Sequence, residues 1–381
     1  MLNCGSSSVK FALLDPATGS RPLTGLADRV GTDEVSVAIR RDGEEQELHP
    51  DDPSHHAVVA ALLGAVTPAE HAAVAGIGHR VVHGGRTFSA SVRIDDAVLR
   101  RLGELVALAP LHMPANLAGI EAARAAFPEL PHVAVFDTAF HQTMPPVAYR
   151  YAVPSSWYTD HYVRRYGFHG TSHRYVSAAA AEVVGRPPAE LRMITLHLGN
   201  GCSAAAIRDG ACIDTTMGLT PLEGLVMGTR SGDIDPGVLG YMGHRLGLDV
   251  DGVLDVLNHS SGLLGLSGHS NDMRTLEQDG SPDAELAIEV FCYRAAKTVG
   301  ALAVALGGLD VLVFTGGIGE HSRRVRATVV ERLGVLGLRL DPEANEQNAP
   351  RISAEGATPV VLVVPTDEER LIAADTLELT G

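Results

Sequence analysis

The chain has 381 residues, of which 45% are apolar and 20% charged, the balance of a folded globular protein rather than a disordered one. That length accommodates two domains of ordinary size, each with its own core. The formal net charge of −16 argues against nucleic acid and against an anionic membrane as partners. Any site for an anionic ligand must therefore be locally positive within an acidic chain.

The sequence is typical of a protein that stays inside the cell. Its four cysteines form no C-x-x-C motif and are too few for a disulfide framework, so reduced thiols are expected. No charged n-region followed by an apolar h-region precedes the first motif. The most apolar long stretch, at 298–309, is too short to span a bilayer. We therefore expect a cytoplasmic protein without a membrane partner.

The first part of the chain predicts strands and a helix in alternation. It opens on the polar stretch NCGSSS at 3–8, which leads into an apolar strand over 9–14. A helix is expected over 115–127, and a buried strand over 133–136 runs into Asp137. Strands that alternate with helices indicate an α/β protein.

The second part of the chain repeats this pattern. A strand over 193–198 ends at Gly199-Asn-Gly201, and a strand over 204–207 ends at Asp209-Gly210, a strong hairpin signal. The later elements are a helix over 283–306 and strands over 309–314 and 360–364. The whole pattern predicts an α/β protein with largely parallel sheets.

Two places in the chain share one arrangement. At 3–14 and again at 193–207, a Gly/Ser turn joins a short strand to a returning strand. Duplication of a βββαβα unit, one per domain with a cleft between the two, would explain the pair. Such hairpins present backbone N–H groups and hydroxyls to an anion, because glycine allows close approach and positive φ.

These hairpins could hold the phosphates of a nucleotide, although a single Gly/Ser cluster is more often just a turn. The chain contains neither the Walker A pattern G-x-x-x-x-G-K-[ST] nor a complete G-x-G-x-x-G. A bound nucleotide would therefore be held by another scheme.

Six stretches concentrate polar and charged residues among glycines and prolines, outside regular periodicity. Loops of this kind on an α/β scaffold usually carry ligand chemistry. Asp137, Gly316 and Glu368 lie near the ends of expected strands, where open α/β sheets bind ligands. The stretches are GHRVVHGG (78–85), FDTAFHQTMP (136–145), RRYGFHGTSH (164–173), HLGNGCS (197–203), GLTPLEGLVMGTRSGDIDPG (218–237) and PTDEER (365–370).

Two other kinds of site, a zinc site and a serine acyl-enzyme site, are alternatives to nucleotide binding. His79 with His83, and His169 with His173, have the i, i+4 spacing of a zinc pair, but neither pair is H-E-x-x-H. Ser7-Ser-Val-Lys10 matches the S-x-x-K of serine acyl enzymes, which also need S-D-N and K-T-G. The chain has neither of those two companion motifs, so both alternatives are less favoured.

Taken together, these blocks resemble the acetate kinase family over nearly the whole chain. The matching stretches run in the family's order from NCGSSSVKF through FDTAFHQTMP and PLEGLVMGTRSGDIDPG to FTGGIGEHS and PTDEER. The resemblance implies the fold of the acetate/sugar kinase, Hsp70 and actin superfamily, an α/β fold of two ribonuclease-H-like domains with an ATP cleft between them. It implies an N-terminal domain of residues 1–139 plus 370–381 and a nucleotide-binding domain of residues 140–369.

The resemblance also implies where ATP and a metal bind. The metal is Mg²⁺, with Mn²⁺ as a possible substitute, and its ligands would be Asn3 and Glu368. The implied ATP contacts are Lys10, His197, Leu198, Gly199, Asn200, Gly201, Asp272, Met273, Arg274, Gly317, Ile318, Gly319, Glu320 and His321.

The substrate site is implied in the same way. Arg80 would bind acetate beside an apolar pocket of Val82, Leu111, Phe168 and Pro221. Asp137 would be the catalytic aspartate, and His169 and Arg230 would stabilise the transition state. The implied partners are acetate, ATP, ADP and acetyl phosphate, a second copy of the chain in a homodimer, and functionally phosphate acetyltransferase.

The chemistry of these residues suits phosphoryl transfer to a carboxylate. A small carboxylic acid has a pKa of about 4–5, so the nucleophile is already ionised at neutral pH and needs no general base. Arginines, a histidine and Mg²⁺ offset the repulsion between two anions and stabilise the charge of the transition state. We therefore expect Asp137 to position Mg²⁺ or Arg80 rather than to accept a proton. Val82 favours acetate, with propionate as a slower substrate.

The chain departs from the family pattern at three places. Family members usually carry several apolar residues before the Asn-x-Gly-Ser-Ser-Ser loop, whereas here only Met1 and Leu2 precede Asn3. We expect a shortened first strand that holds Asn3 less firmly, with the natural start lying upstream. His321 and Asp367 stand where the family commonly has Asn. The alternatives left open are a propionate or butyrate kinase of this fold, a serine acyl-transfer enzyme built on Ser7 and Lys10, and a catalytically silent ATP-binding sensor.

Overall fold

The computed structural model describes residues 1–110 and 112–381. The chain packs into two compact units, one of residues 1–140 with 367–381 (unit 1) and one of residues 141–366 (unit 2). The domain limits implied by the resemblance, after residues 139 and 369, stay a prediction. No helix of the described residues is long and apolar enough to cross a membrane.

The strands of unit 1 described here form an eight-stranded sheet in the order β5-β4-β3-β2-β1-β6-β8-β7. Strands β1 to β5 are antiparallel neighbours, and β1, β6 and β8 run parallel. The bounds are β1 (Leu2–Cys4), β2 (Ser8–Leu13), β3 (Leu23–Asp28), β4 (Ser36–Arg41), β5 (Glu44–Leu48), β6 (Ile77–Val81), β7 (Val92–Arg93) and β8 (His132–Phe136).

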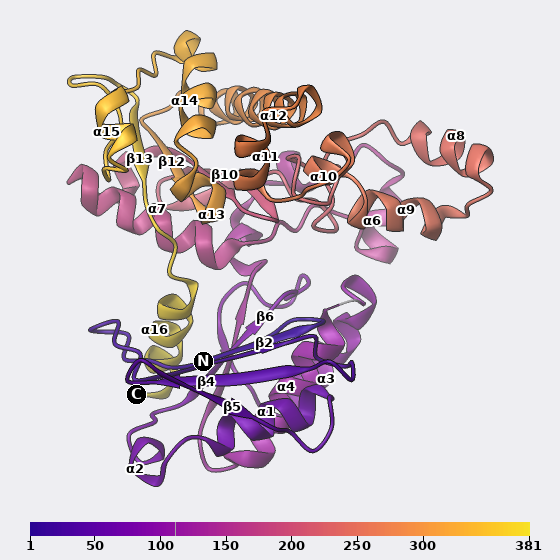
Figure 1. The fold of residues 1–381 in the computed structure, drawn as a ribbon, viewed down its shortest axis with the longest axis vertical. Helices are drawn as coiled ribbons and strands as arrows, with labels where there is room; N and C mark the ends of the chain where they lie inside the picture. The colour runs from indigo at the N-terminus through magenta and orange to yellow at the C-terminus, as the bar shows by residue number, and fades with distance from the viewer. Residues whose placement is uncertain (111) are drawn as a thin grey trace. The chain divides into compact units, whose positions relative to one another are not determined.

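The helices of unit 1 cover this sheet and fix its site-bearing strands. Gly119 lets α4 approach β1, because a Cβ there would lie 2.3 Å from Cys4 Sγ. Gly78 lets α16 approach β6, because a Cβ there would lie 2.3 Å from Thr376 Oγ1. Figure 1 shows α16, the last helix, beside the strands of unit 1. The bounds are α1 (His55–Gly64), α2 (Pro68–His71), α3 (Asp96–Glu104), α4 (Met113–Ala126) and α16 (Glu368–Thr380).

Unit 2 has a five-stranded sheet in the order β11-β10-β9-β12-β13. Strands β9, β10 and β11 are antiparallel, whereas β9, β12 and β13 run parallel. The β10–β11 turn uses positive φ at both Asp209 (54°) and Gly210 (76°), as a two-residue hairpin requires. The bounds are β9 (Arg192–Leu198), β10 (Cys202–Arg208), β11 (Ala211–Thr215), β12 (Val311–Thr315) and β13 (Val360–Val363).

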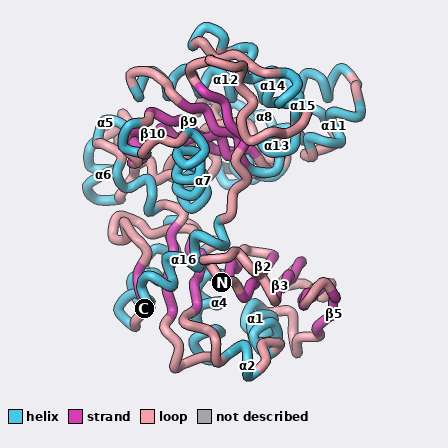
Figure 2. Tube along the Cα trace, turned by 90° about the vertical axis from the view of Figure 1, so that its left-hand side faces the viewer, coloured by secondary structure: helices cyan, strands magenta, loops and turns pink. Residues whose placement is uncertain are grey.

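The helices of unit 2 pack on its sheet, α12 against β10 and β11 and α7 against β9 and β12 (Figure 2). The bounds are α5 (Pro146–Tyr149), α6 (Ser155–His161), α7 (Gly170–Val184), α8 (Gly237–Leu246), α9 (Val250–His259), α10 (Gly262–Ser267), α11 (Met273–Asp279), α12 (Pro282–Leu306), α13 (Gly316–His321), α14 (Arg323–Arg332) and α15 (Pro342–Glu346).

Both predicted Gly/Ser hairpins are present. The turn at 5–7 joins β1 to β2, and the turn at 199–201 joins β9 to β10. Numbered within each unit, β3-β2-β1-β6-β8 and β11-β10-β9-β12-β13 have the same strand order, 3-2-1-4-5. The predicted duplication is thereby confirmed at the level of the sheets. Unit 1 adds β4 and β5 at one edge and β7 at the other.

Candidate active site

Arg80 and Asp137 form a bidentate ion pair in unit 1. Their strands β6 and β8 are parallel neighbours, and Asp137 directly follows β8. Arg80 Nε donates to Asp137 Oδ1 at 2.9 Å, and Arg80 Nη2 donates to Asp137 Oδ2 at 2.5 Å. The Asp137 side chain is 2% exposed and that of Arg80 is 24% exposed. The carboxylate therefore fixes the plane of the guanidinium while one edge of Arg80 remains accessible.

Burial and charge act in opposite directions on this pair. Burial raises the pKa of the Asp137 carboxyl, and the charge of Arg80 opposes that rise. Burial also disfavours the charged form of Arg80, but the charge and hydrogen bonds of Asp137 outweigh it, so the pKa of Arg80 is raised. Two aligned charge-assisted hydrogen bonds keep such a pair ionised at neutral pH.

Asn3 and Glu368 bring oxygen ligands to the same part of unit 1. Asn3 lies in β1 and its Oδ1 accepts from Arg80 Nη1 at 3.3 Å. Glu368 begins α16, and its negative charge contributes to raising the pKa of both Arg80 and Asp137. Among the described residues, no group of three or more His, Cys, Asp or Glu side chains could hold a metal ion alone. Two oxygen ligands suit Mg²⁺, which commonly takes its other ligands from water and substrate phosphates.

Asp367, one of the departures from the family pattern, is paired with Arg21 and with the backbone of α16. Its Oδ1 accepts from Arg21 Nη2 at 2.6 Å and from the backbone N–H of Arg370 at 3.0 Å. It is thus the N-cap of α16 and fixes the position of Glu368, the next residue.

Val82 follows β6 and is half-buried. Its backbone N–H donates to Asn116 Oδ1 at 2.9 Å, and Asn116 Nδ2 donates to the Cys4 carbonyl at 2.6 Å. One buried amide therefore fixes the ends of β1 and β6, which carry Asn3 and Arg80. Leu111, the other pocket residue expected from this unit, lies outside the described residues.

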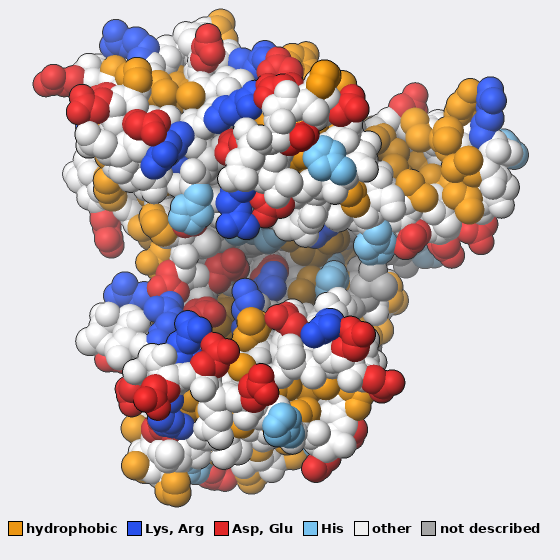
Figure 3. Space-filling view, in the orientation of Figure 1, with side chains coloured by type: hydrophobic (Ala, Val, Ile, Leu, Met, Phe, Trp, Pro, Cys, Tyr) orange, Lys and Arg blue, Asp and Glu red, His pale blue; other side chains and the backbone are white. Residues whose placement is uncertain are grey.

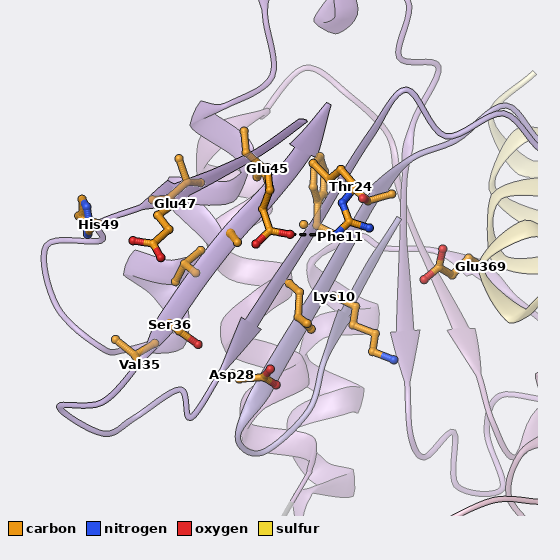
Figure 4. Close-up of a pocket in the computed structure, with 17 residues that line it drawn as sticks. Lys10, Phe11, Thr24, Asp28, Val35, Ser36, Glu45, Glu47, His49 and Glu369 are labelled. Carbon is orange, nitrogen blue, oxygen red and sulfur yellow. Dashed lines mark hydrogen bonds and ion pairs between the residues drawn. The ribbon is translucent and has the colours of Figure 1, made fainter. Parts of the chain in front are cut away.

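Lys10 lies on the exposed side of β2, opposite Asn3 in the strand register. It lines a hollow of about 580 Å³ on the outer face of β2–β5, together with Asp28, Glu45 and Glu369 (Figure 4). Of the described residues that line this hollow, Lys10 alone belongs to the expected ligand contacts. Although this hollow is large, its lining residues therefore do not identify it as the active site.

In unit 2, the β9–β10 hairpin carries the expected contacts His197 to Gly201. Gly199 N donates to the Gly201 carbonyl at 3.1 Å, which closes the turn. Asn200 accepts from Gly228 N through its carbonyl at 2.9 Å and from Asn271 Nδ2 through its side chain at 3.0 Å. Leu198 is fully buried in the sheet. The turn is therefore held from two further loops.

Arg230 and His169 converge on this turn at Gly201. A Cβ atom at position 201 would lie 3.4 Å from both Arg230 Nη2 and His169 Nε2. Arg230 Nη1 donates to the Pro221 carbonyl at 2.7 Å, which orients the guanidinium. Burial lowers the pKa of Arg230, although a guanidinium stays protonated in proteins. The glycine thus leaves space bordered by a cation and an imidazole, which suits an oxyanion.

His169 is the N-cap residue of α7 and has a left-handed backbone, with φ of 55°. Its Nδ1 contacts Ser203 Oγ at 2.8 Å, and its ring stacks on His197 with centroids 4.3 Å apart. His197 Nδ1 in turn contacts Ser172 Oγ at 2.8 Å. The preceding residue, Phe168, is buried, and its carbonyl contacts His141 Nε2 at 2.9 Å.

The glycine-rich segment after β12 forms α13, which contains Gly317, Ile318 and Gly319. Its Glu320 carboxylate accepts from Gly316 N at 3.0 Å and from Thr366 N at 3.2 Å. The side chain of Glu320 therefore holds the chain after β12 and β13 in place. His321, one of the departures from the family pattern, is exposed at the end of α13.

The expected contacts Asp272 to Arg274 lie at the start of α11. Asp272 is the N-cap residue and accepts from the backbone N–H of Arg274 at 2.8 Å. Arg274 Nη2 donates to Asp272 Oδ2 at 2.9 Å, and its side chain is 82% exposed. Met273 is buried in the core, so its backbone rather than its side chain is available to a ligand.

Several positioning residues escaped the sequence analysis. Asn116 is a polar residue on an apolar helix, and this contrast could have identified it as a positioning residue. Ser203 lies in a buried alanine-rich strand. Arg165 donates to the Thr215 and Thr216 carbonyls and, at 2.5 Å, to Glu223, so it fixes the loop that carries Pro221. No pattern in the sequence distinguishes this arginine from its neighbours.

The structure also bears on the alternative chemistries. His79 lies in strand β6 and contacts His132 Nδ1 at 3.0 Å, so its spacing to His83 is not helical. His173 contacts Thr195 and Ser203 through its two ring nitrogens, which are thereby unavailable to a metal. Ser7 lies in the exposed β1–β2 turn, and its carbonyl accepts from Val30 N at 3.0 Å.

These features define an α/β protein with a duplicated ribonuclease-H-like sheet and a glycine hairpin beside which an arginine and a histidine converge. The Acetokinase family profile matches residues 1–374, and the chain belongs to that family. It is 54% identical over 390 residues to the acetate kinase of Deinococcus radiodurans, covering 100% of this chain and 98% of that protein. It is also 54% identical over 386 residues to an acetate kinase of Pseudomonas aeruginosa, with the same coverage.

Solved structures agree with this assignment. A crystal structure of Porphyromonas gingivalis acetate kinase superimposes with a TM-score of 0.95 at 44% identity, covering 100% of this chain and 98% of that one. A propionate kinase from Francisella tularensis gives a TM-score of 0.94 at 45% identity, covering 99% and 98%. The predicted family and fold class, that of the actin-like ATPase-type kinases, are therefore confirmed.

Proposed function

We propose that this chain is an acetate kinase, a phosphotransferase that moves the γ-phosphoryl group of ATP to the carboxylate of acetate and gives acetyl phosphate and ADP, reversibly. The observation that carries the proposal is the convergence of Arg230 Nη2 and His169 Nε2 on Gly201 of a glycine hairpin. A cation and an N–H donor at one point suit the developing charge of a transferring phosphoryl group.

In unit 1, Arg80 would bind the carboxylate of acetate. Nε and one N–H of Nη2 already donate to Asp137. Acetate would therefore use the remaining edge, formed by Nη1 and the second N–H of Nη2. Asp137 would act as a positioning residue for Arg80, since an ionised acetate leaves it no proton to accept. Val82, Leu111, Phe168 and Pro221 would surround the methyl group.

In unit 2, His169 and Arg230 would stabilise the phosphoryl group during an in-line transfer. ATP would be held by Lys10, by His197 to Gly201, by Asp272 to Arg274 and by Gly317 to His321. Asn3 and Glu368 would hold Mg²⁺, or Mn²⁺ in its place, and the bound metal would neutralise charge on the nucleotide phosphates.

We propose further that the chain acts as a cytoplasmic homodimer coupled in function to phosphate acetyltransferase, which consumes acetyl phosphate. Apolar side chains gather on the exposed surface of α8 and α9 (Figure 3). Tyr241 is 61% exposed, Leu246 58% and Val250 61%, a pattern suited to cover by a second copy. Replacing Tyr241 and Leu246 with Glu should give monomers in light scattering if this surface is the interface.

The direct test is formation of acyl phosphate, trapped as hydroxamate, from Mg-ATP with acetate, propionate or butyrate. Acetate should be turned over best, and omission of Mg²⁺ should abolish the signal. His169→Ala should lower kcat strongly without unfolding the chain. Absence of acyl phosphate with every acid would reject the kinase and favour a silent ATP-binding protein.

A propionate kinase is the second candidate, because a propionate kinase is among the similar solved structures. Val82→Ala should enlarge the pocket and raise kcat/KM for propionate relative to acetate by about 10-fold, since one methylene is worth about 1–3 kcal/mol. Val81→Ala is the matched control, because Val81 is the buried last residue of β6 and directly precedes Val82. Equal effects of the two substitutions on selectivity would remove Val82 from the acyl pocket.

A further inference from the structure

A chain of hydrogen bonds runs through unit 2 behind His169. Thr195 Oγ1 contacts His173 Nδ1 at 2.7 Å, His173 Nε2 contacts Ser203 Oγ at 2.8 Å, and Ser203 Oγ contacts His169 Nδ1 at 2.8 Å. Thr195, His173 and Ser203 are fully buried. The chain links β9, α7 and β10 and ends at one ring nitrogen of His169.

The secondary structure explains why these side chains meet. His169 and His173 are four residues apart at the start of α7 and so lie on one face of the helix. Ser203 is opposite His197 in the antiparallel β9–β10 register, and Thr195 lies two residues before His197. Alternation along a strand places Thr195, His197 and Ser203 on one face of the sheet, and α7 packs against β9.

The number of protons limits how this chain can be ordered. Burial lowers the pKa of His173 well below its ordinary value, so its imidazole is neutral and carries one ring N–H. Each hydroxyl also carries one hydrogen, and so does a neutral His169. His169 and His173 are the only partners of the Ser203 side chain among the described residues, so its buried hydroxyl hydrogen must serve one of these two contacts. If Ser203 donates to His169, His173 must donate to Ser203 and accept from Thr195; if Ser203 donates to His173, every bond is reversed. The chain therefore has two ordered arrangements, in which every bond points either toward His169 or away from it.

The two arrangements give His169 different chemistry. In the first, Thr195 donates to His173, His173 Nε2 donates to Ser203, and Ser203 donates to His169 Nδ1. A neutral His169 then carries its hydrogen on Nε2, the atom that faces Gly201 and Arg230. In the reverse arrangement, a neutral His169 presents a lone pair at Nε2, which repels a phosphoryl oxygen.

The titratable and charged side chains that the structure places around His169 include His173 on α7 itself, His197 on β9, and Arg230 in the loop before α8. A positive charge such as that of Arg230 opposes a second positive charge nearby. When the His169 ring is neutral, its tautomer decides whether it can donate to an anion.

We propose that Ser203 and His173 are positioning residues that hold His169 as the Nε2–H tautomer, with the hydrogen directed toward the transferring phosphoryl group. The role of His169 toward phosphate rests on the proposed function. The tautomer itself is a property of the protein without substrate and can be measured separately.

The first test is ¹⁵N NMR of ring nitrogens in histidine-labelled protein without ligands at pH 8, with His169 assigned by comparison with His169→Ala. We expect an unprotonated Nδ1 and a protonated Nε2. In Ser203→Ala, His169 should exchange between both tautomers. Protonation of Nδ1 in the unsubstituted protein, or an unchanged His169 spectrum in Ser203→Ala, would overturn the proposal.

The second test is kinetic. Removing a transition-state donor lowers kcat by about 10²–10³-fold, so losing only its orientation should lower kcat by about 10-fold at pH 8. The KM for ATP should stay within about 2-fold. The deficit of Ser203→Ala should shrink at low pH, because an imidazolium carries hydrogen on both nitrogens. A deficit that is independent of pH would indicate a merely structural role.

Matched variants keep the result interpretable. Ser177→Ala removes another buried α7 hydroxyl, which donates to the Arg174 carbonyl outside this chain of bonds, and should change neither spectrum nor rate. Ser203→Thr keeps the hydroxyl and should retain the tautomer. If Ser203→Ala does not fold, Thr195→Val removes the first donor of the chain instead. The same changes in the His169 spectrum and in kcat are expected for it. If the unsubstituted protein shows the expected tautomer but His169→Ala keeps full activity, the proposed catalytic role of His169 is rejected and the tautomer assignment stands.

Discussion

At Gly201, a single hydrogen atom in place of a methyl group leaves space beside Arg230 and His169. A Cβ there would be in van der Waals contact with both side chains, at 3.4 Å from each, without overlap. Gly201→Ala should therefore fold normally but lower kcat/KM for ATP by about 10–100-fold, because the methyl group occupies the position of a phosphoryl oxygen. Initial rates and thermal unfolding would measure the two effects.

The control for this substitution is Gly300→Ala. Gly300 lies in α12 and a Cβ there has no neighbour within 4 Å among the described residues. The change should leave the rates unaltered and stabilise the chain by about 0.5–1 kcal/mol, the helix preference for alanine. Normal ATP kinetics in Gly201→Ala would place the phosphates elsewhere.

Asp137→Asn separates the two roles that the sequence left open for this residue. An amide places an N–H donor against one guanidinium N–H of Arg80, which breaks the bidentate pair. We expect kcat/KM for acetate to fall by about 10²-fold, while the Mg²⁺ concentration for half-maximal rate changes little. A large shift in Mg²⁺ dependence would instead make Asp137 a metal ligand.

The matched control is Asp310→Asn in unit 2. Arg192 also donates to Asp310 through Nε and Nη2, at 3.0 and 2.8 Å. Its loss should lower stability without affecting the KM for acetate. A similar rise of that KM in both variants would show that the effect of Asp137→Asn is a general loss of stability.

The sequence left two partners open for Asp137, Mg²⁺ or Arg80, and the structure shows the pair with Arg80. The two residues are 57 apart in the chain, and their contact depends on the parallel register of β6 and β8. The sequence could not predict which N–H groups of Arg80 the pair uses, because that is a matter of tertiary packing, which composition and spacing do not encode.

At the scale of elements, prediction succeeded where the local signal was strong. The Asp209-Gly210 turn and the buried strands β8, β9, β12 and β13 follow from hairpin chemistry and from apolar runs. Strand β5 was missed because its sequence EEQEL is exposed and mostly charged. Residues 170–173, taken as part of a loop, begin helix α7, since the glycine and hydroxyl residues there hid the helical period.

Helix α13 depends on a buried arginine. Arg326 is fully buried and donates to the carbonyls of Gly319 and Glu320 and to Asn345 Oδ1. Burial lowers its pKa to about 10, so it stays charged at neutral pH. The cation satisfies carbonyls at the end of α13, whose segment 317–321 is a proposed ATP contact.

Arg326→Met should destabilise the chain by about 2–4 kcal/mol, because several buried acceptors lose their donor. It should also raise the KM for ATP through disorder in α13, with little change in the KM for acetate. Urea unfolding and initial rates would measure both. Arg339→Met, a change in an exposed arginine, is the control. An unchanged KM for ATP in a folded Arg326→Met would separate α13 from the nucleotide.

At the scale of the whole molecule, the repeated 3-2-1-4-5 strand order explains why the sequence shows the same hairpin twice. In each unit the first two strands and their turn lie at the centre of the sheet. A Gly/Ser turn there lies at the end of the parallel strands, where α/β sheets bind ligands. The shared strand order therefore places two Gly/Ser turns at equivalent positions of the two sheets, each with different neighbouring side chains.

Buried neutral histidines should make the whole molecule sensitive to acid. Burial lowers the pKa of His141 from 6.5 to about 4 and that of His173 well below 6.5. Between pH 6.5 and 4 the unfolded chain binds these protons and the folded chain does not, so the free energy of unfolding falls as pH falls. His141 alone contributes a loss of about 3 kcal/mol across that window.

Urea unfolding of the whole chain, followed at pH 7.5, 6.5, 5.5 and 4.5, would test this directly. The slope of unfolding free energy against pH should correspond to uptake of at least two protons near pH 5.5, and His141→Gln should reduce it by about one proton. His161→Gln, a change in an exposed histidine on α6, is the control for the substitution itself. If His141→Gln leaves the slope intact, His141 is already protonated in the folded chain. Its contact with the Phe168 carbonyl would then be a charge-assisted hydrogen bond, and a positive charge would lie beside His173, against whose ring His141 packs edge-on.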